Sequence, residues 1–286
     1  MIILNRKKPI FYSALMLTGV NLLLRFISTG FQVYLSGQIG AAGIGLLQLV
    51  LSVGMMAMTA GIGGIRTATM YLTAEEVGRK TTKNLRWVLN GCFTYSLLSS
   101  GTVALLLYYF APMIANHWIG DARTVDALRL FAVFLPISCG CGVMTGYFTA
   151  QGRIGILSIV EIAEQLCSMG ITVTLLTLWA GNDPALACQS VITGSGVGSC
   201  LTLILLLLFS KKLAVPSGEP IPMAKRLCQT ALPLALADDL KVGINTVENL
   251  MVPKRLALHT GTQSPLAAFG LVSGMVFPVM MFPVAT

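Results

Sequence analysis

Long apolar runs are the feature that most restricts what this chain can form. A helix of about 20 residues, rising 1.5 Å per residue, is long enough to cross a hydrocarbon core of roughly 30 Å. Apolar runs of about this length or longer occur at residues 10–36, 43–70, 87–111, 128–149, 155–180, 187–209, 228–252 and 266–286. The predicted fold class is therefore all-α, a polytopic transmembrane helical bundle with about eight spans.

The composition agrees with a membrane protein. Charged residues make up 10% of the 286 residues and apolar residues 55%, whereas a soluble domain has about 25% charged residues. The first run is too long for a signal-peptide core, so we interpret it as a membrane helix. The seven cysteines lie mostly in apolar runs without a CxxC pair, and no Walker loop or catalytic motif occurs. We therefore expect no metal site, no cofactor and no enzymatic activity.

The net charge of +8 comes largely from Lys and Arg in the short segments between the runs. Twelve of them fall on one side of the predicted bundle: Arg6, Lys7, Lys8, Arg79, Lys80, Lys83, Arg86, Arg153, Lys211, Lys212, Lys225 and Arg226. Four fall on the other side: Arg123, Arg129, Lys254 and Arg255. This asymmetry is a topology signal and does not indicate a nucleic-acid partner. It places the N-terminus, the loop 75–86 and the loop 211–227 in the cytoplasm.

A short internal repeat suggests two lobes. Residues 42–46 followed by Met55-Met56 resemble residues 267–271 followed by Met280-Met281. The copies lie in the second and eighth predicted spans, six spans apart, so both would enter the membrane in the same direction, as a parallel repeat. We predict a first six-helix lobe at 1–210, a cytoplasmic linker at 211–227, and the first two spans of an incomplete second lobe at 228–286.

The first two predicted spans carry polar residues, which are costly at membrane depth and are therefore candidates for function. One helical face of the first span contains Asn21, Arg25, Ser28 and Gln32. In the second span Ser52, Thr59 and Arg66 recur every seven residues. Arg25 is predicted near the bilayer centre, whereas Arg66 could either extend to the interface or line a cavity.

Two further spans have polar faces. The fifth carries Ser158, Glu161, Gln165, Ser168 and Thr172 on one face, with Glu164 on its flank. The seventh carries Asp238, Lys241, Asn245 and Glu248, of which Asp238 and Lys241 are close enough to pair. The charged members could form an ion-pair network that fixes helix packing, or they could line a shared aqueous transport cavity. Four polar faces are hard to bury against lipid, which favours the cavity.

Several short segments resemble one family of exporters. They are Leu24-Arg25-Phe26, residues 42–49, residues 61–66, residues 146–152 and Glu164-Gln165. The chain resembles the stage V sporulation protein B family of polysaccharide and lipid-linked precursor exporters, within the multidrug/oligosaccharidyl-lipid/polysaccharide (MOP) flippase superfamily. The resemblance implies two six-helix lobes in a V, usually about 12 to 14 spans in all, and alternating access in a bacterial inner membrane.

The resemblance also implies a substrate and its contacts. The substrate would be an undecaprenyl-type lipid-linked saccharide for cell-wall or spore-envelope assembly, whose pyrophosphate is held by cavity arginines. Arg25 and, less directly, Arg66 occupy similar places, with Asn21 and Gln32 beside Arg25. One rival is a multidrug exporter coupled to H⁺ or Na⁺, with Asp238 or Glu161 carrying the ion. Another is a membrane scaffold that transports nothing.

Overall fold

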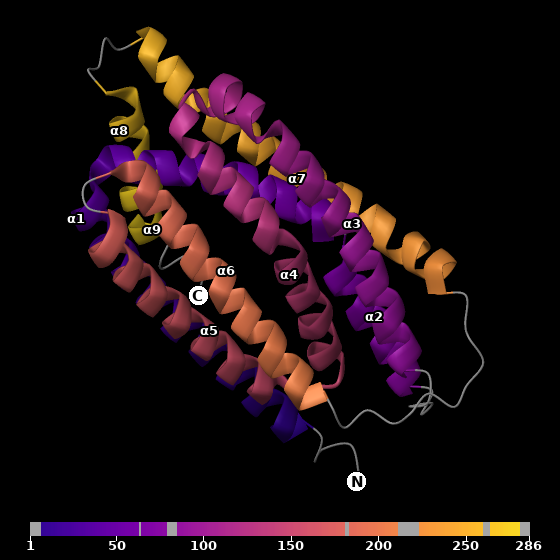
Figure 1. The fold of residues 1–286 in the computed structure, drawn as a ribbon. Coiled ribbons are helices and arrows are strands. Elements are labelled where there is room, and N and C mark those ends of the chain that lie inside the picture. Colours follow the sequence, from indigo (N-terminus) through magenta and orange to yellow (C-terminus); the bar gives the residue numbers. More distant parts are fainter. Residues whose placement is uncertain are drawn as a thin grey trace.

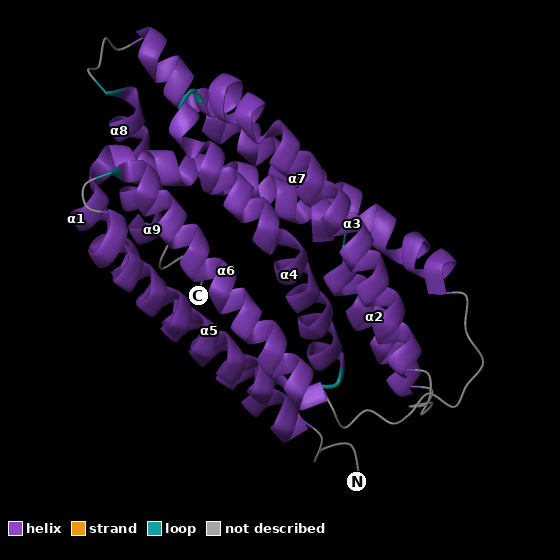
Figure 2. Ribbon diagram, viewed as in Figure 1, coloured by secondary structure: helices purple, strands orange, loops and turns teal. Residues whose placement is uncertain are grey.

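The computed structural model describes residues 7–62, 64–78, 85–180, 183–210, 223–259 and 264–280. Every regular element in these ranges is a helix, as Figure 1 and Figure 2 show, which confirms the predicted all-α class. The long elements are α1 (Lys7–Ile62), α2 (Ile65–Gly78), α3 (Leu85–Met113), α4 (Val125–Ala150), α5 (Ile154–Leu175), α6 (Pro184–Ser210) and α7 (Met223–His259). The short ones are η2 (Ile114–Ile119), η3 (Ala122–Thr124), η4 (Leu176–Ala180), α8 (Pro265–Phe269), η5 (Gly270–Val276) and α9 (Phe277–Met280).

Within the described residues, five helical segments are long and apolar enough to cross a membrane, by length and composition. They are residues 18–78, 85–119, 122–150, 154–179 and 184–210. The first has 61 residues, about three times the roughly 20 residues that one crossing needs. The chain is thus a multi-pass membrane protein, and these segments contain the first six predicted spans.

The first two predicted spans form the two parts of α1, which change direction at Gly40. The backbone of Gly40 has φ 69° and ψ 173°, a conformation outside the helical region that L side chains rarely adopt. Figure 1 shows the N-terminal part of α1 beside α5 and the part after the bend running towards α2. The turn predicted between residues 36 and 43 is therefore made by one glycine.

The predicted end of the second span is wrong. The sequence predicts one span over 43–70 and a loop at 75–86, but α1 ends at Ile62 and α2 begins at Ile65. Gly64, with φ 65°, lies in the break. The helix then continues to Gly78 because Leu72, Thr73 and Glu76 remain buried against neighbouring helices. Arg66 consequently belongs to the first turn of α2.

The seventh and eighth predicted spans differ from the others. Helix α7 includes the predicted range 228–252, but it is not among the described helices apolar enough to be a candidate span. Its charged residues Asp238, Asp239, Lys241 and Glu248 account for this difference. The eighth predicted span coincides with α8, η5 and α9 as far as Met280, and the end of that range lies outside the described residues.

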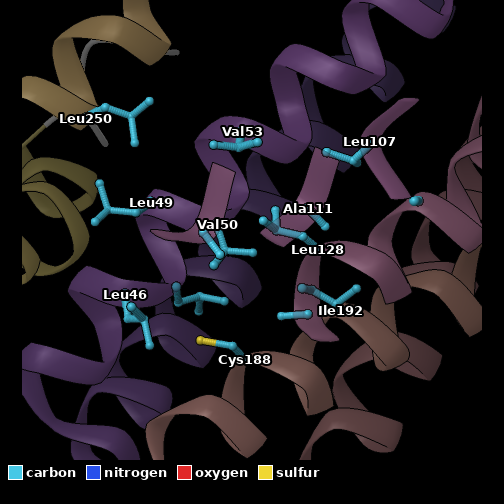
Figure 3. Packing of buried hydrophobic residues seen from close by; sticks show 14 of the residues in the cluster. Leu46, Leu49, Val50, Val53, Leu107, Ala111, Leu128, Cys188, Ile192 and Leu250 are labelled. Atoms are coloured by element: carbon cyan, nitrogen blue, oxygen red, sulfur yellow. The ribbon is translucent and has the colours of Figure 1, made fainter. Parts of the chain in front are cut away.

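The interior is packed by apolar side chains from distant parts of the chain. In Figure 3, Leu49 and Val50 of α1 lie among side chains of α3, α4, α6 and α7, such as Leu128 and Ile192. A second cluster joins α2, α3, α4, α5 and α6. Lipid tails are as apolar as these residues, so close packing and not exclusion from water stabilises helix contacts at membrane depth.

The two copies of the predicted repeat touch at Gly45 and Gly270, which are aligned in the repeat. A Cβ on Gly270 would lie 2.6 Å from the backbone nitrogen of Gly45 and would also meet the carbonyl oxygen of Ala41. A Cβ on Gly45 would meet the carbonyl oxygen of Leu266. The backbones of α1, α8 and η5 can therefore approach this closely only because both positions are glycine.

Candidate functional site

A cavity of about 540 Å³ lies among α1, α2, α4, α5 and α6. Its described lining includes three charged side chains, Arg66, Glu161 and Glu164. Five hydroxyl groups line it as well, those of Ser138, Thr145, Ser195, Ser199 and Thr202. The volume is within the range of about 300–1,000 Å³ that ligand pockets usually have.

Glu164 is held in place by α6. Its two carboxylate oxygens accept hydrogen bonds from Ser199 Oγ, at 3.3 Å, and from Thr202 Oγ1, at 2.8 Å. Each bond joins α5 to α6, and hydrogen bonds to a charged group are stronger than those between neutral groups. Glu164 is therefore a structural member of the cavity wall as well as one of its charges.

Glu161, one turn earlier on α5, is not held by hydrogen bonds from α6. Its half-buried side chain makes no hydrogen bond or ion pair within the part of the chain that the structure describes. Arg66 and Glu164 both act on it electrostatically across the cavity. The Glu161 carboxyl group is thus available to a ligand.

Arg66 reaches the cavity because of the break at Gly64. Its side chain is exposed, while its backbone packs closely against α4 at Gly146. A Cβ on Gly146 would meet the carbonyl oxygen of Arg66 and would lie 3.3 Å from the backbone nitrogen of Met70. The two glycines therefore bring the backbone of Arg66 close to α4, and Arg66 is among the residues that line the cavity.

The polar face of the first span lies elsewhere. Asn21, Arg25 and Gln32 are not among the residues that line the cavity. Ser28 Oγ accepts a hydrogen bond from Gln165 Nε2 of α5, at 3.2 Å, and Gln32 Nε2 donates one to the carbonyl oxygen of Gly274 in η5, at 2.8 Å. Asn21 is exposed and Arg25 half-buried. This face therefore connects α1 to two neighbours.

The predicted polar face of α5 is divided among several contacts. Glu161 faces the cavity, and Gln165 contacts α1. Ser168 and Thr172 lie against α6, where a Cβ on Gly194 would be 2.7 Å from the Ser168 carbonyl oxygen. Gly194 thus allows α6 to pack closely against α5.

The charged residues of α7 do not join this cavity. Asp238, Lys241 and Glu248 are exposed, and no ion pair links Asp238 to Lys241 in the described structure. Asp239 and Glu248 instead line a groove of about 510 Å³ whose described walls belong to α7 alone. The predicted pairing is therefore not formed here, and the four polar faces do not meet in one described cavity.

Two residues of α7 that the sequence did not single out attach it to α1. Asn249 Nδ2 donates a hydrogen bond to Ser52 Oγ, at 2.9 Å. Thr246 Oγ1 lies 3.2 Å from the carbonyl oxygen of Ser52 and is buried. Ser52 and Arg66 recur at a seven-residue spacing, but they do not line one cavity, because Ser52 faces α7. The sequence signal that could have identified Asn249 was its position directly after Glu248, a residue of the predicted polar face.

Comparison with known proteins agrees with this fold. A family described as "Polysaccharide biosynthesis protein" matches residues 45–260. The stage V sporulation protein B of Bacillus subtilis (strain 168) is 24% identical over 207 residues, which cover 70% of this chain and 39% of that protein. The chain thus spans well under half of that relative's length.

Two solved structures have the same fold. One is the inward-facing conformation of a multidrug resistance MATE family transporter of the MOP superfamily, with a TM-score of 0.65 and 16% identity over 92% of this chain and 59% of that one. The other, described as "protein A", has a TM-score of 0.63 and 15% identity over 96% of this chain and 63% of that one. At these identities the likeness establishes the fold.

Proposed function

Because the chain belongs to the polysaccharide biosynthesis protein family and has the helical fold of the MOP superfamily, we propose that it exports a lipid-linked saccharide. The substrate is a saccharide joined through phosphate to an undecaprenyl-type lipid, as the resemblance to the stage V sporulation protein B family implies. Transport across the bacterial inner membrane takes place by alternating access between two lobes, of which residues 1–210 are the first.

The chemistry of the cavity is the observation that carries this proposal. A saccharide presents hydroxyl groups that both donate and accept hydrogen bonds, and the cavity offers the hydroxyl groups of serines and threonines together with the Glu161 carboxylate. A phosphate presents oxygens that a guanidinium binds in a bidentate fork. Arg66 is the cavity residue that supplies such a fork.

In this proposal Arg66, and not Arg25 as first expected, is the residue that contacts the phosphate. Arg25 lies on α1 outside the described cavity. The proposal ranks Arg66 first for phosphate contact and keeps Arg25, with Asn21 and Gln32, as residues that position the first span.

The test uses proteoliposomes that contain a fluorescent lipid-linked saccharide, whose transfer to the outer leaflet exposes the fluorophore to an impermeant quencher. Arg66→Gln should abolish transfer, and Arg66→Lys should reduce it at least tenfold, because lysine keeps the charge but loses the fork. Arg86→Gln, which removes an exposed charge at the start of α3, is the matched control and should transfer normally. Full transfer by Arg66→Gln at normal membrane abundance would contradict the proposal.

A second function is favoured by one specific observation. The cavity contains two carboxylates and one guanidinium, and a carboxylate-rich cavity attracts cations. In a multidrug exporter of the same superfamily, Glu161 would then carry the coupling H⁺ or Na⁺. Glu161→Gln separates the two functions: it should abolish ion-driven drug export, but should leave Arg66-dependent transfer of the lipid-linked saccharide measurable. A membrane scaffold would depend on neither residue.

A further inference from the structure

One face of α2 is polar and almost completely buried. Thr69, Thr73 and Glu76 are spaced i, i+4 and i+7, which places them on one side of the helix. The two threonines are 0% exposed and Glu76 is 3% exposed. Helix α2 packs against α3, α4 and α7, and the buried side chains that α3 and α4 contribute in this region are mainly apolar, such as Leu89 and Phe148. None of the three residues lines the cavity that contains Arg66.

These polar groups lack suitable partners. Thr69 Oγ1, Thr73 Oγ1 and Glu76 Oε2 are buried atoms with no hydrogen-bond partner among the described residues. Thr69 interacts with the thiol of Cys92, which is only a weak donor and acceptor. Glu76 also has no ion-pair partner in the described structure.

A partner that carries positive charge would satisfy Glu76 in its ionised form. Burying an ionised carboxylate without a countercharge is strongly unfavourable, and a buried hydroxyl without a partner adds a further cost. A water molecule could satisfy the hydroxyl groups but would leave the charge of Glu76 uncompensated. A small cation satisfies both needs, because carboxylate and hydroxyl oxygens are the ligands that hard cations prefer.

We propose that a monovalent cation of the Na⁺ or K⁺ class binds between Thr73 and Glu76, on the buried polar face of α2. The two residues are i, i+3 neighbours on α2, with Cβ atoms about 5–6 Å apart, so one ion can contact both side chains. Thr69 lies on the same face, one turn before Thr73, and bonds to water in the ion's coordination shell. This inference is independent of which substrate the protein transports.

A single charge fits this site better than a double one. Divalent cations in proteins are usually held by several carboxylates or by histidine and cysteine. Within the described residues no group of three or more His, Cys, Asp or Glu side chains could hold a metal ion. The Glu76 carboxylate alone matches the charge of a monovalent ion.

The test measures the thermal stability of the purified protein in lipid nanodiscs. Li⁺, Na⁺ and K⁺ chlorides are compared with N-methylglucamine chloride at equal ionic strength. A bound ion raises the melting temperature by mass action, by roughly 3–6 °C at ten times its dissociation constant. We expect at least one alkali ion to give this rise, and radioactive sodium or the potassium analogue thallium to bind directly.

Isosteric variants locate the ion. Glu76→Gln removes the charge and Thr73→Val removes the hydroxyl group, and both should eliminate the rise. In N-methylglucamine Glu76→Gln should be at least as stable as the wild type, because the uncompensated charge is gone. Glu75→Gln is the matched control: it removes a carboxylate that points about 100° away on the same helix and should keep the rise. An equal melting temperature in all salts, or a rise that persists in Glu76→Gln, overturns the inference.

Discussion

At the scale of single residues, Glu161 and Glu164 show how similar side chains take different roles. They are one turn apart on α5 and both line the cavity. Glu164 accepts two hydrogen bonds from α6, whereas Glu161 has none from described residues. The sequence predicted that both lie inside the bundle, but it could not separate them, because the difference depends on which hydroxyl groups of α6 face α5.

The hydrogen bond from Thr202 to Glu164 leads to a prediction. Thr202→Val keeps the shape of the side chain but removes the donor, which should lower the free energy of unfolding by about 1.5–3 kcal/mol, the usual contribution of a hydrogen bond to a charged group. Thr193→Val is the matched control on α6, because Thr193 Oγ1 bonds only to the carbonyl oxygen of Gln189 in its own helix. Thermal unfolding in detergent should show a clearly larger loss for Thr202→Val, and equal losses would contradict the role assigned to this bond.

At the scale of elements, the sequence predicted which segments are helical better than it predicted where each helix begins and ends. Helices α3 to α6 lie close to the predicted ranges because each is a single apolar run bounded by polar or glycine residues. The break at Gly64 was missed, since a glycine inside an apolar run gives no sign of its φ angle. Helix α7 was predicted as a span, and its helical pattern was correct, but its charges make it too polar to qualify as one by composition.

The contact of α6 with α5 leads to a prediction at this scale. A Cβ on Gly194 would meet Thr172 Oγ1 and lie 2.7 Å from the carbonyl oxygen of Ser168. Gly194→Ala should therefore push the two helices apart and lower the free energy of unfolding by about 1–3 kcal/mol.

Gly170→Ala is the control for this substitution. Gly170 lies on α5, and its added Cβ would have nothing within 4 Å. Because alanine is the better helix former, this change should be neutral or slightly stabilising. Melting temperatures in the same detergent compare the two variants, and a Gly194→Ala protein as stable as the wild type would show that the helices can move apart without cost.

At the scale of the whole molecule, one cavity contains only some of the predicted site residues, because distances across the bundle are not encoded in local spacing. Arg66, Glu161 and Glu164 line the same cavity. Arg25 and the charges of α7 do not join them there, since helix rotation, the bend at Gly40 and the break at Gly64 decide which face meets which neighbour. A polar stripe therefore indicates that a helix has a protein-facing side, but it does not identify the partner.

The direction in which the bundle crosses the membrane remains a prediction from charge asymmetry, and α4 offers a direct test. Ala122 and Arg153 are exposed residues just beyond the two ends of α4, which has 26 residues and is therefore long enough to separate them by a bilayer. The twelve-to-four distribution of Lys and Arg places Arg153 in the cytoplasm and Ala122 outside.

In a background without native cysteines, an impermeant maleimide added to intact cells should label Ala122→Cys, but should label Arg153→Cys only after the membrane is opened. Labelling of Arg153→Cys alone in intact cells would reverse the topology. In the proposed transport cycle it would also exchange the faces on which the substrate enters and leaves, because alternating access assigns a direction only once the cytoplasmic side is known.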